Sequence, residues 1–167
     1  MDKIVVEAKN YVTTLLKDFK NEWYFFHNLE HTLEVFERAT YIWEKEWIND
    51  DLMEMLQLWA LFHDTGFIQT FDNNEINWFY IFKERINKNY PDYPMDRMDM
   101  IKGIIMATTV SIQPQNILEE IIKDADMDNI WRVDFFEKWE LLRLEYKKIG
   151  WIDYDEYGRK NRNFNLL

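Results

Sequence analysis

Apolar residues recur at helical spacing along nearly the whole chain, and this periodicity is the strongest constraint on its fold. Strict alternation of apolar and polar residues, the pattern of a half-buried strand, extends over no useful length. The chain has only four glycines and three prolines among 167 residues, so few positions interrupt the helical pattern. This length suits one domain with one core. The sequence therefore predicts an all-α fold, a compact single-domain helical bundle over residues 1–167.

Seven segments carry a helical stripe, and turn signals separate them. The expected helices are residues 5–19, 29–47, a segment capped by Asn49-Asp50 and ending at His63, 75–86, 95–108, 116–126 and 135–149. The last segment has the cleanest stripe, formed by Phe135, Trp139, Leu142, Tyr146 and Ile149, and Gly150 ends it. Residues 151–167 are expected to form a final helix or an ordered arm.

The charge is one-sided, with 31 acidic against 20 basic residues and a formal net charge of −11. Binding to a nucleic-acid backbone is therefore disfavoured, because that attraction needs clustered Lys and Arg. No window approaches 18 consecutive apolar residues, and residues 1–7 lack the basic-then-apolar layout of a secretory signal. We therefore expect a cytoplasmic protein that binds no membrane.

His63 and Asp64 stand side by side where an apolar helix breaks at Thr65-Gly66. Leu56 and Trp59 precede His63 by seven and four residues, which places the imidazole on the inward face of that helix. There it is either a hydrogen-bonded core residue or, together with Asp64, a ligand of a divalent cation. The chain holds no cysteine, so any metal site has to use nitrogen and oxygen ligands.

His31 and Asp126 also lie on inward faces of predicted helices. Val35 follows His31 by four residues, and Ile122 precedes Asp126 by four. Two imidazoles and two carboxylates suit a divalent ion such as Mn²⁺, Fe²⁺, Co²⁺, Ni²⁺ or Zn²⁺. Coordination positions left open to water would make such a site catalytic rather than structural.

Three motifs appear in a fixed order along the chain: Phe26-His27-Asn28-Leu29-Glu30-His31-Thr32-Leu33-Glu34-Val35, Ala60-Leu61-Phe62-His63-Asp64-Thr65-Gly66-Phe67 and Lys123-Asp124-Ala125-Asp126-Met127-Asp128. They resemble motifs of the HD superfamily of metal-dependent phosphohydrolases, in particular its small single-domain bacterial members. The resemblance covers roughly residues 20–150. It implies a helical bundle that hydrolyses a phosphoester or phosphoanhydride, and metal ligands at His31, His63, Asp64 and Asp126.

The chain departs from these relatives at three positions. Relatives often carry a histidine where Asn74 stands, a lysine at the position of Thr109 and a glycine at that of Trp131. The chain has three histidines in all (His27, His31 and His63), and so lacks the additional histidines that two-metal members of the superfamily use. The resemblance therefore implies one divalent metal ion, Mn²⁺, Fe²⁺, Co²⁺, Ni²⁺, Zn²⁺ or Mg²⁺, with His63 and Asp64 at the catalytic centre.

Further site residues are assigned by their positions along the chain. Glu75 heads an apolar stripe and would transfer a proton or position a water, or else it forms a helix-capping box with Asp72. His27 lies four residues before His31 and would contact the phosphate or the substrate, or else cap the start of the helix. The basic residues expected to meet a phosphate are Lys102, Lys123 and Arg132.

The resulting interpretation is a metal-dependent phosphohydrolase that uses a metal-activated water on a small phosphorylated substrate, a nucleotide above all. The departures at Asn74, Thr109 and Trp131 motivate an alternative, a nucleotide-binding or regulatory protein without turnover. A third alternative, suggested by the surplus of aromatic residues, is a structural interaction module. Exposed tryptophans along residues 29–47 would provide the surface of a homodimer.

Overall fold

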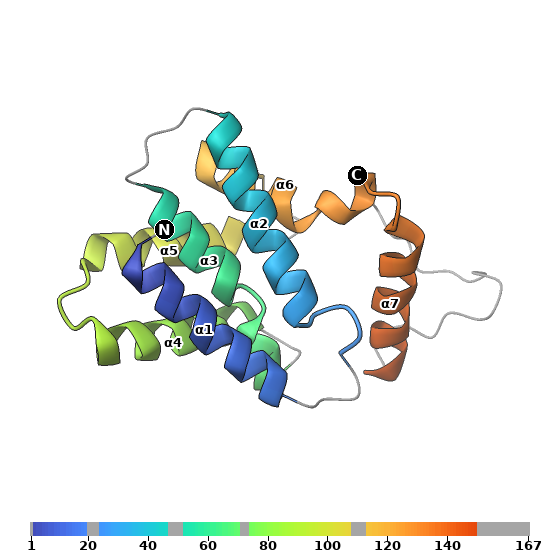
Figure 1. Ribbon diagram of the computed structural model, residues 1–167, viewed down its shortest axis with the longest axis horizontal. Coiled ribbons are helices and arrows are strands. Elements are labelled where there is room, and N and C mark those ends of the chain that lie inside the picture. Colours follow the sequence, from blue (N-terminus) through green and yellow to red (C-terminus); the bar gives the residue numbers. More distant parts are fainter. Residues whose placement is uncertain (1, 20–23, 47–51, 71–73, 108–112, 150–167) are drawn as a thin grey trace.

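The computed structural model describes residues 2–19, 24–46, 52–70, 74–107 and 113–149, and within them it contains helices but no strand (Figure 1). The predicted all-α fold is thereby confirmed. The elements are α1 (Lys3–Asp18), α2 (Leu29–Lys45), α3 (Met53–Phe62), the 3₁₀ segment η2 (Thr65–Ile68), α4 (Asn74–Asn89), α5 (Met95–Ala107), α6 (Ile117–Asp126), the 3₁₀ segment η3 (Asp128–Trp131) and α7 (Phe135–Lys148). None of the helices in the described ranges has the length and apolar character needed to cross a membrane.

Helix α3 lies at the centre of the hydrophobic core. All its residues from Met55 to Phe62 are buried, as expected for a helix that is apolar on nearly every side. Gln57 is the one polar residue in this stretch, and its side-chain amide donates a hydrogen bond to the hydroxyl of Thr40 at 3.2 Å. Helices α1, α2, α4, α5 and α6 all pack against α3. The end of α3, where His63 follows, is therefore enclosed by the bundle.

The amphipathic helices around α3 turn their apolar stripes toward it. The buried residues of α1 are Ile4, Val5, Ala8 and Val12, and those of α2 are His31, Thr32, Val35, Phe36, Ala39 and Trp43. Trp43 is only 1% exposed, so the expectation of an exposed tryptophan surface on this helix is wrong at that position. It is wrong because Trp43 belongs to the stripe that packs into the core. Trp47 lies outside the described residues.

Side-chain caps determine where the helices that carry candidate ligands begin. The side-chain oxygen of Asn28 accepts hydrogen bonds from the backbone N–H groups of Glu30 and His31, at 2.8 and 3.1 Å. The side-chain oxygen of Asn116 accepts one from the backbone N–H of Glu119 at 3.1 Å, at the start of α6. His31 is thus held in the first turn of α2. The cap expected at Asn49-Asp50 and the expected arm 151–167 lie outside the described residues.

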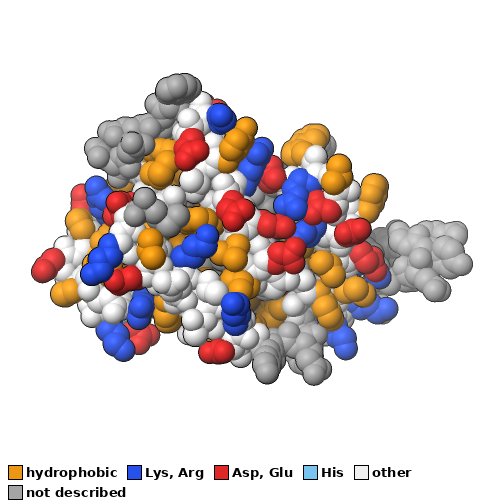
Figure 2. Space-filling model, viewed as in Figure 1, with side chains coloured by type: hydrophobic (Ala, Val, Ile, Leu, Met, Phe, Trp, Pro, Cys, Tyr) orange, Lys and Arg blue, Asp and Glu red, His pale blue; other side chains and the backbone are white. Residues whose placement is uncertain are grey.

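Helix α7 buries different side chains from those that its sequence pattern predicts. The stripe from Phe135 to Ile149 predicts an apolar inward face, yet Trp139 is 44% exposed, the other four stripe residues are only half-buried, and the buried residues of α7 are Lys138 and Glu145. This expectation is corrected because α7 lies at one edge of the molecule, next to the loop before α2 (Figure 1), where its partners are polar. Hydrophobic side chains consequently reach the surface at that end of the molecule (Figure 2).

Candidate metal centre

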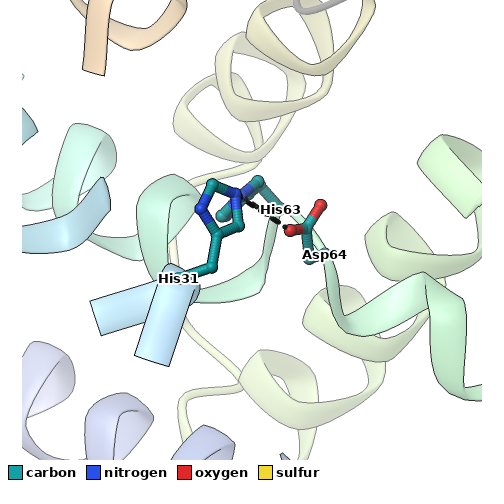
Figure 3. Close-up of side chains that lie close together, drawn as sticks. All are labelled: His31, His63 and Asp64. Carbon is teal, nitrogen blue, oxygen red and sulfur yellow. Dashed lines mark hydrogen bonds and ion pairs between the residues drawn. The ribbon is translucent and has the colours of Figure 1, made fainter. Parts of the chain in front are cut away.

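His31, His63 and Asp64 bring three potential metal ligands together from two helices (Figure 3). His31 lies in the first turn of α2, and His63 and Asp64 follow the last turn of α3. The Nε2 atoms of the two imidazoles are 3.5 Å apart. Oδ2 of Asp64 lies 3.4 Å from Nε2 of His31 and 3.1 Å from Nε2 of His63. One oxygen and two nitrogens therefore face a common point.

Asp126, the last residue of α6, approaches the same point from a third helix. Its Oδ1 lies 3.2 Å from Nε2 of His31 and 3.8 Å from Nε2 of His63. Its side chain is 29% exposed, whereas those of both histidines are 5% exposed. The structure thus places Asp126 beside the group of His31, His63 and Asp64, and the Asp126 side is the one most exposed to solvent.

The separations among His31, His63 and Asp64 are close to those around one small cation, whereas Oδ1 of Asp126 is near Nε2 of His31 but 3.8 Å from that of His63. Atoms that bind a common ion at about 2.1 Å lie roughly 3.0–3.4 Å from one another. Oδ2 of Asp64 is buried and has no aligned hydrogen bond among the described residues, although both imidazole nitrogens are near it. A buried carboxylate oxygen without a hydrogen bond is expected where a cation belongs. The two imidazoles favour a transition ion over Mg²⁺.

The protein orients both imidazoles through their surroundings. Nδ1 of His63 donates a hydrogen bond to the carbonyl oxygen of Ala60 at 2.9 Å. A carbonyl can only accept, so Nδ1 carries the proton and Nε2 is the nitrogen available to an ion. The ring of Trp59 stacks on His63 at 5.1 Å between centroids, and that of Phe26 lies 4.5 Å from His31.

Electrostatics within the cluster favour positive charge at its centre. Burial alone would lower the pKa of His63, but the carboxylates of Asp64 and Asp126 raise it to about 9. Burial alone would raise the pKa of Asp64, but His63 and the other imidazoles hold it below its usual range. The pKa of Asp126 is also lowered, against the effect of burial, by its hydrogen bond with His31 and the charge of His63. Both carboxylates therefore stay ionised, which suits a divalent cation.

A small hollow lies beside the ligands, and charged residues line it. His31, Asp126, Arg38 and Arg132 are among its lining residues, and its volume is about 10 Å³, room for roughly one water molecule. A larger cavity, about 560 Å³, lies elsewhere, against the start of α1 and the turn before α5, and none of the four candidate ligands lines it. The small hollow is therefore the one that concerns the metal centre.

Both arginines of this hollow already face carboxylates. Arg132, predicted to meet a phosphate, lies 3.2 Å from Glu34 and 2.6 Å from Asp134. Arg38, which the sequence patterns did not single out, lies 2.7 Å from Asp128. A phosphate at this place would have to compete with these carboxylates for the guanidinium groups.

The other predicted site residues have varied surroundings. Lys102 is exposed on α5, with its ammonium 5.7 Å from the ring centroid of Phe79. Lys123 is half-buried on α6, one turn before Asp126. Glu75 belongs to α4, but its side chain lies outside the described part of the chain. Their assigned roles therefore stay predictions.

Of the three departures, the described part of the chain shows the surroundings of Trp131 alone. The side chain of Trp131 is 88% exposed at the end of η3. The side chain of Asn74 and the whole of Thr109 lie outside the described part.

His27 is held by a residue that the sequence patterns did not identify, Glu145 of α7. Nδ1 of His27 forms a hydrogen bond with Oε1 of Glu145. Burial alone would lower the pKa of His27, but the carboxylates of Asp64 and Glu145 raise it. No pattern in the sequence identifies Glu145, because its contact with His27 joins segments 118 residues apart.

Comparison with known proteins gives one match. A family model described as HD domain matches residues 28–127, well over half of the chain. No curated protein and no solved structure matches the chain. The matched range contains all four candidate ligands, whereas His27 and α7 lie outside it.

Proposed function

Because the chain belongs to the HD-domain family of metal-dependent phosphohydrolases, we propose that it hydrolyses a phosphoester or phosphoanhydride bond of a small substrate. The observation that carries the proposal is the convergence of two imidazole nitrogens and two carboxylate oxygens from α2, α3 and α6. A nucleotide is the first substrate class to test. The net charge of −11 disfavours long nucleic acids, whereas a bound cation reverses the field locally for a small phosphate.

His31, His63, Asp64 and Asp126 would hold one divalent ion. Such an ion supplies Lewis acidity toward phosphoryl oxygens and lowers the pKa of water near neutrality. The imidazole of His63 is held through Nδ1 and Ala60, and its remaining nitrogen is aimed at the cluster. Asp126 borders the hollow and has the most exposed side chain of the four, so substrate would approach from its side.

The remaining roles belong to residues around the centre. Attack on phosphorus needs stabilisation of charge more than a covalent partner. Lys102, Lys123 and Arg132 would supply positive charge, His27 would contact the phosphate, and Glu75 would accept or donate the proton. The chain has no cysteine and one serine, Ser111, so a covalent nucleophile has little support in its composition.

The proposal is tested by replacing His63 and Asp64 together with alanine. Wild type and the double variant are assayed with added Mn²⁺ against a panel of nucleotides and model phosphodiesters, with metal quantified on the same samples. We expect turnover to fall by at least about 100-fold, because two ligands of the ion are removed. Asp124→Ala is the matched control, since this carboxylate is exposed on α6 two residues before Asp126. Undiminished turnover in the double variant would reject the assignment.

A nucleotide-binding protein without turnover is the second candidate. It is motivated by the departures from the family pattern at Asn74, Thr109 and Trp131. Thermal melting separates the two functions. Stabilisation by a nucleotide without product release, across several metals, would favour binding alone.

A further inference from the structure

Glu145 is a carboxylate buried without exposure to solvent, and its described partners all lie in the segment before α2. Its Oε2 accepts hydrogen bonds from the backbone N–H groups of Phe26 and His27, at 2.8 and 3.1 Å. Its Oε1 accepts the hydrogen bond from Nδ1 of His27. These partners are 118 and 119 residues away in the chain. Such hydrogen bonds replace the hydration that a buried carboxylate loses.

The segment that Glu145 holds borders the metal centre directly. The ring of His27 meets the ring of His31 edge-on, with 6.0 Å between centroids. The centroid of the His27 ring also lies 4.3 Å from that of Phe67, three residues after Asp64. The side chain of His27 is 15% exposed, so a ligand from solvent can reach it. His27 is therefore placed at the border between the candidate ligands and solvent.

The contact with Glu145 determines which ring nitrogen of His27 can bind a ligand. An ionised carboxylate only accepts hydrogen bonds, so Nδ1 of His27 carries a proton that is directed at Glu145. Nε2 is the nitrogen that remains, and among the described residues it has no hydrogen-bond partner. Without Glu145, the imidazole would be free to turn to other rotamers.

We infer that Glu145 is a positioning residue, which holds His27 so that Nε2–H of its imidazolium form donates a hydrogen bond to a phosphoryl oxygen of the substrate beside the metal centre. This inference deepens, and rests on, the phosphohydrolase function proposed above for the same site. Helix α7, which carries Glu145 and lies beyond the range matched by the family model, would thereby orient a substrate-binding side chain.

Lys138 provides the matched control for a general loosening of α7. It lies on the same face of that helix, and its ammonium is 3.3 Å from Glu30 and 3.1 Å from Glu34 on α2. Lys138→Gln removes a polar contact between α7 and α2 without touching His27. Glu145→Gln is close to isosteric, and its amide oxygen can still accept from the backbone N–H groups. The two variants therefore separate the docking of α7 from the orientation of His27.

The experiment follows the imidazole nitrogens by NMR in the full-length zinc-loaded protein, with inorganic phosphate as the probe. The chain has only three histidines, so three rings are to be assigned. In wild type and in Lys138→Gln, phosphate is expected to shift the Nε2 signal of His27. In Glu145→Gln, that shift is expected to need at least about tenfold more phosphate, the effect of losing one charge-assisted hydrogen bond. Circular dichroism on each variant checks that the helices are intact.

Three results would overturn the inference: no response of His27 to phosphate in wild type, equal responses in wild type and Glu145→Gln, or equal losses in Glu145→Gln and Lys138→Gln. The hydrolysis panel, run on the same samples, distinguishes this failure from failure of the proposed function. If the wild type hydrolyses nothing, yet its His27 signal responds to phosphate in a Glu145-dependent way, the phosphohydrolase function is rejected. The positioning role of Glu145 toward a bound phosphate is then supported. A wild type and Glu145→Gln with equal kcat and KM would reject the positioning role alone.

Discussion

Helices α3 and α7 are both rich in apolar residues, but they bury opposite kinds of side chain. Every residue of α3 from Met55 to Phe62 is buried. On α7, the buried residues are Lys138 and Glu145, while Phe136 is 79% exposed. The difference follows from their neighbours, because five helices surround α3 whereas α7 meets the carboxylates of Glu30 and Glu34 and the segment before α2.

This comparison teaches that periodicity locates the apolar face of a helix without saying whether that face will be covered. Other helices cover the apolar residues of α3, and His63, which follows this helix, is buried as predicted. The stripe of α7 did not become part of the core cluster. The two regions nevertheless meet at one site, since α3 supplies candidate ligands and α7 holds His27 through Glu145.

The largest difference between the two regions is expected in stability. Phe82 of α4 is fully buried and lies 5.4 Å, between ring centroids, from Phe62 of α3. Phe82→Ala is expected to lower the free energy of unfolding by about 3–5 kcal/mol, because it removes apolar burial and leaves a cavity. Urea denaturation followed by circular dichroism measures the change. A loss below about 1 kcal/mol would mean that the core around α3 is not tightly packed.

The second expected effect concerns the metal centre at the end of α3. A divalent ion at about 100 times its Kd should raise the free energy of unfolding by about 2.7 kcal/mol, because it binds the folded state. Thermal melts with added metal or with chelator measure the difference. The double replacement of His63 and Asp64 by alanine should abolish it, and Lys138→Gln should keep it. Equal stabilisation of wild type and the double variant would place the ion elsewhere.

A smaller effect is expected where α7 meets α2. Lys138→Gln should lower the free energy of unfolding by at most about 1 kcal/mol, since the ion pairs it removes are partly exposed. Glu30, one of its partners, has a side chain that is 71% exposed. Repeating the urea titration in about 1 M NaCl, where charges are screened beyond about 3 Å, should shrink the difference. A cost that persists in high salt would show that Lys138 acts through packing.

The smallest effect is expected on the outer face of α7. Phe136→Ala has the same chemistry as Phe82→Ala, but its side chain is 79% exposed. We expect a change in the free energy of unfolding within about 0.5 kcal/mol, as for most surface substitutions. The same urea titration measures it. A cost as large as that at Phe82 would show that the aromatic face of α7 is covered in solution and would break the comparison.

Much of the fold and part of the site could be predicted from the sequence. Helical spacing put His31, His63 and Asp126 on inward faces, and the order of the motifs joined them to Asp64. The structure groups His31, His63 and Asp64 within reach of one ion, and Oδ1 of Asp126 lies 3.2 Å from Nε2 of His31. Periodicity succeeds here because α2 and α6 both pack against α3, so their inward faces lie near the end of that helix.

Contacts between polar residues far apart in the chain could not be predicted in the same way. Glu145 has an ordinary helical context in sequence, and its link to His27 depends on how α7 docks against the segment before α2. Arg132 looked available to a phosphate, but Glu34 and Asp134 already pair with it. Such pairings depend on tertiary placement, which a helical pattern does not contain.

The metal centre is tested most directly by locating a transition ion through anomalous scattering in crystals of the Mn²⁺- or Zn²⁺-loaded protein. We predict one peak at about 2.0–2.2 Å from Nε2 of His31, Nε2 of His63 and a carboxylate oxygen of both Asp64 and Asp126. Tightly bound metal with its peak away from these four side chains would contradict the account.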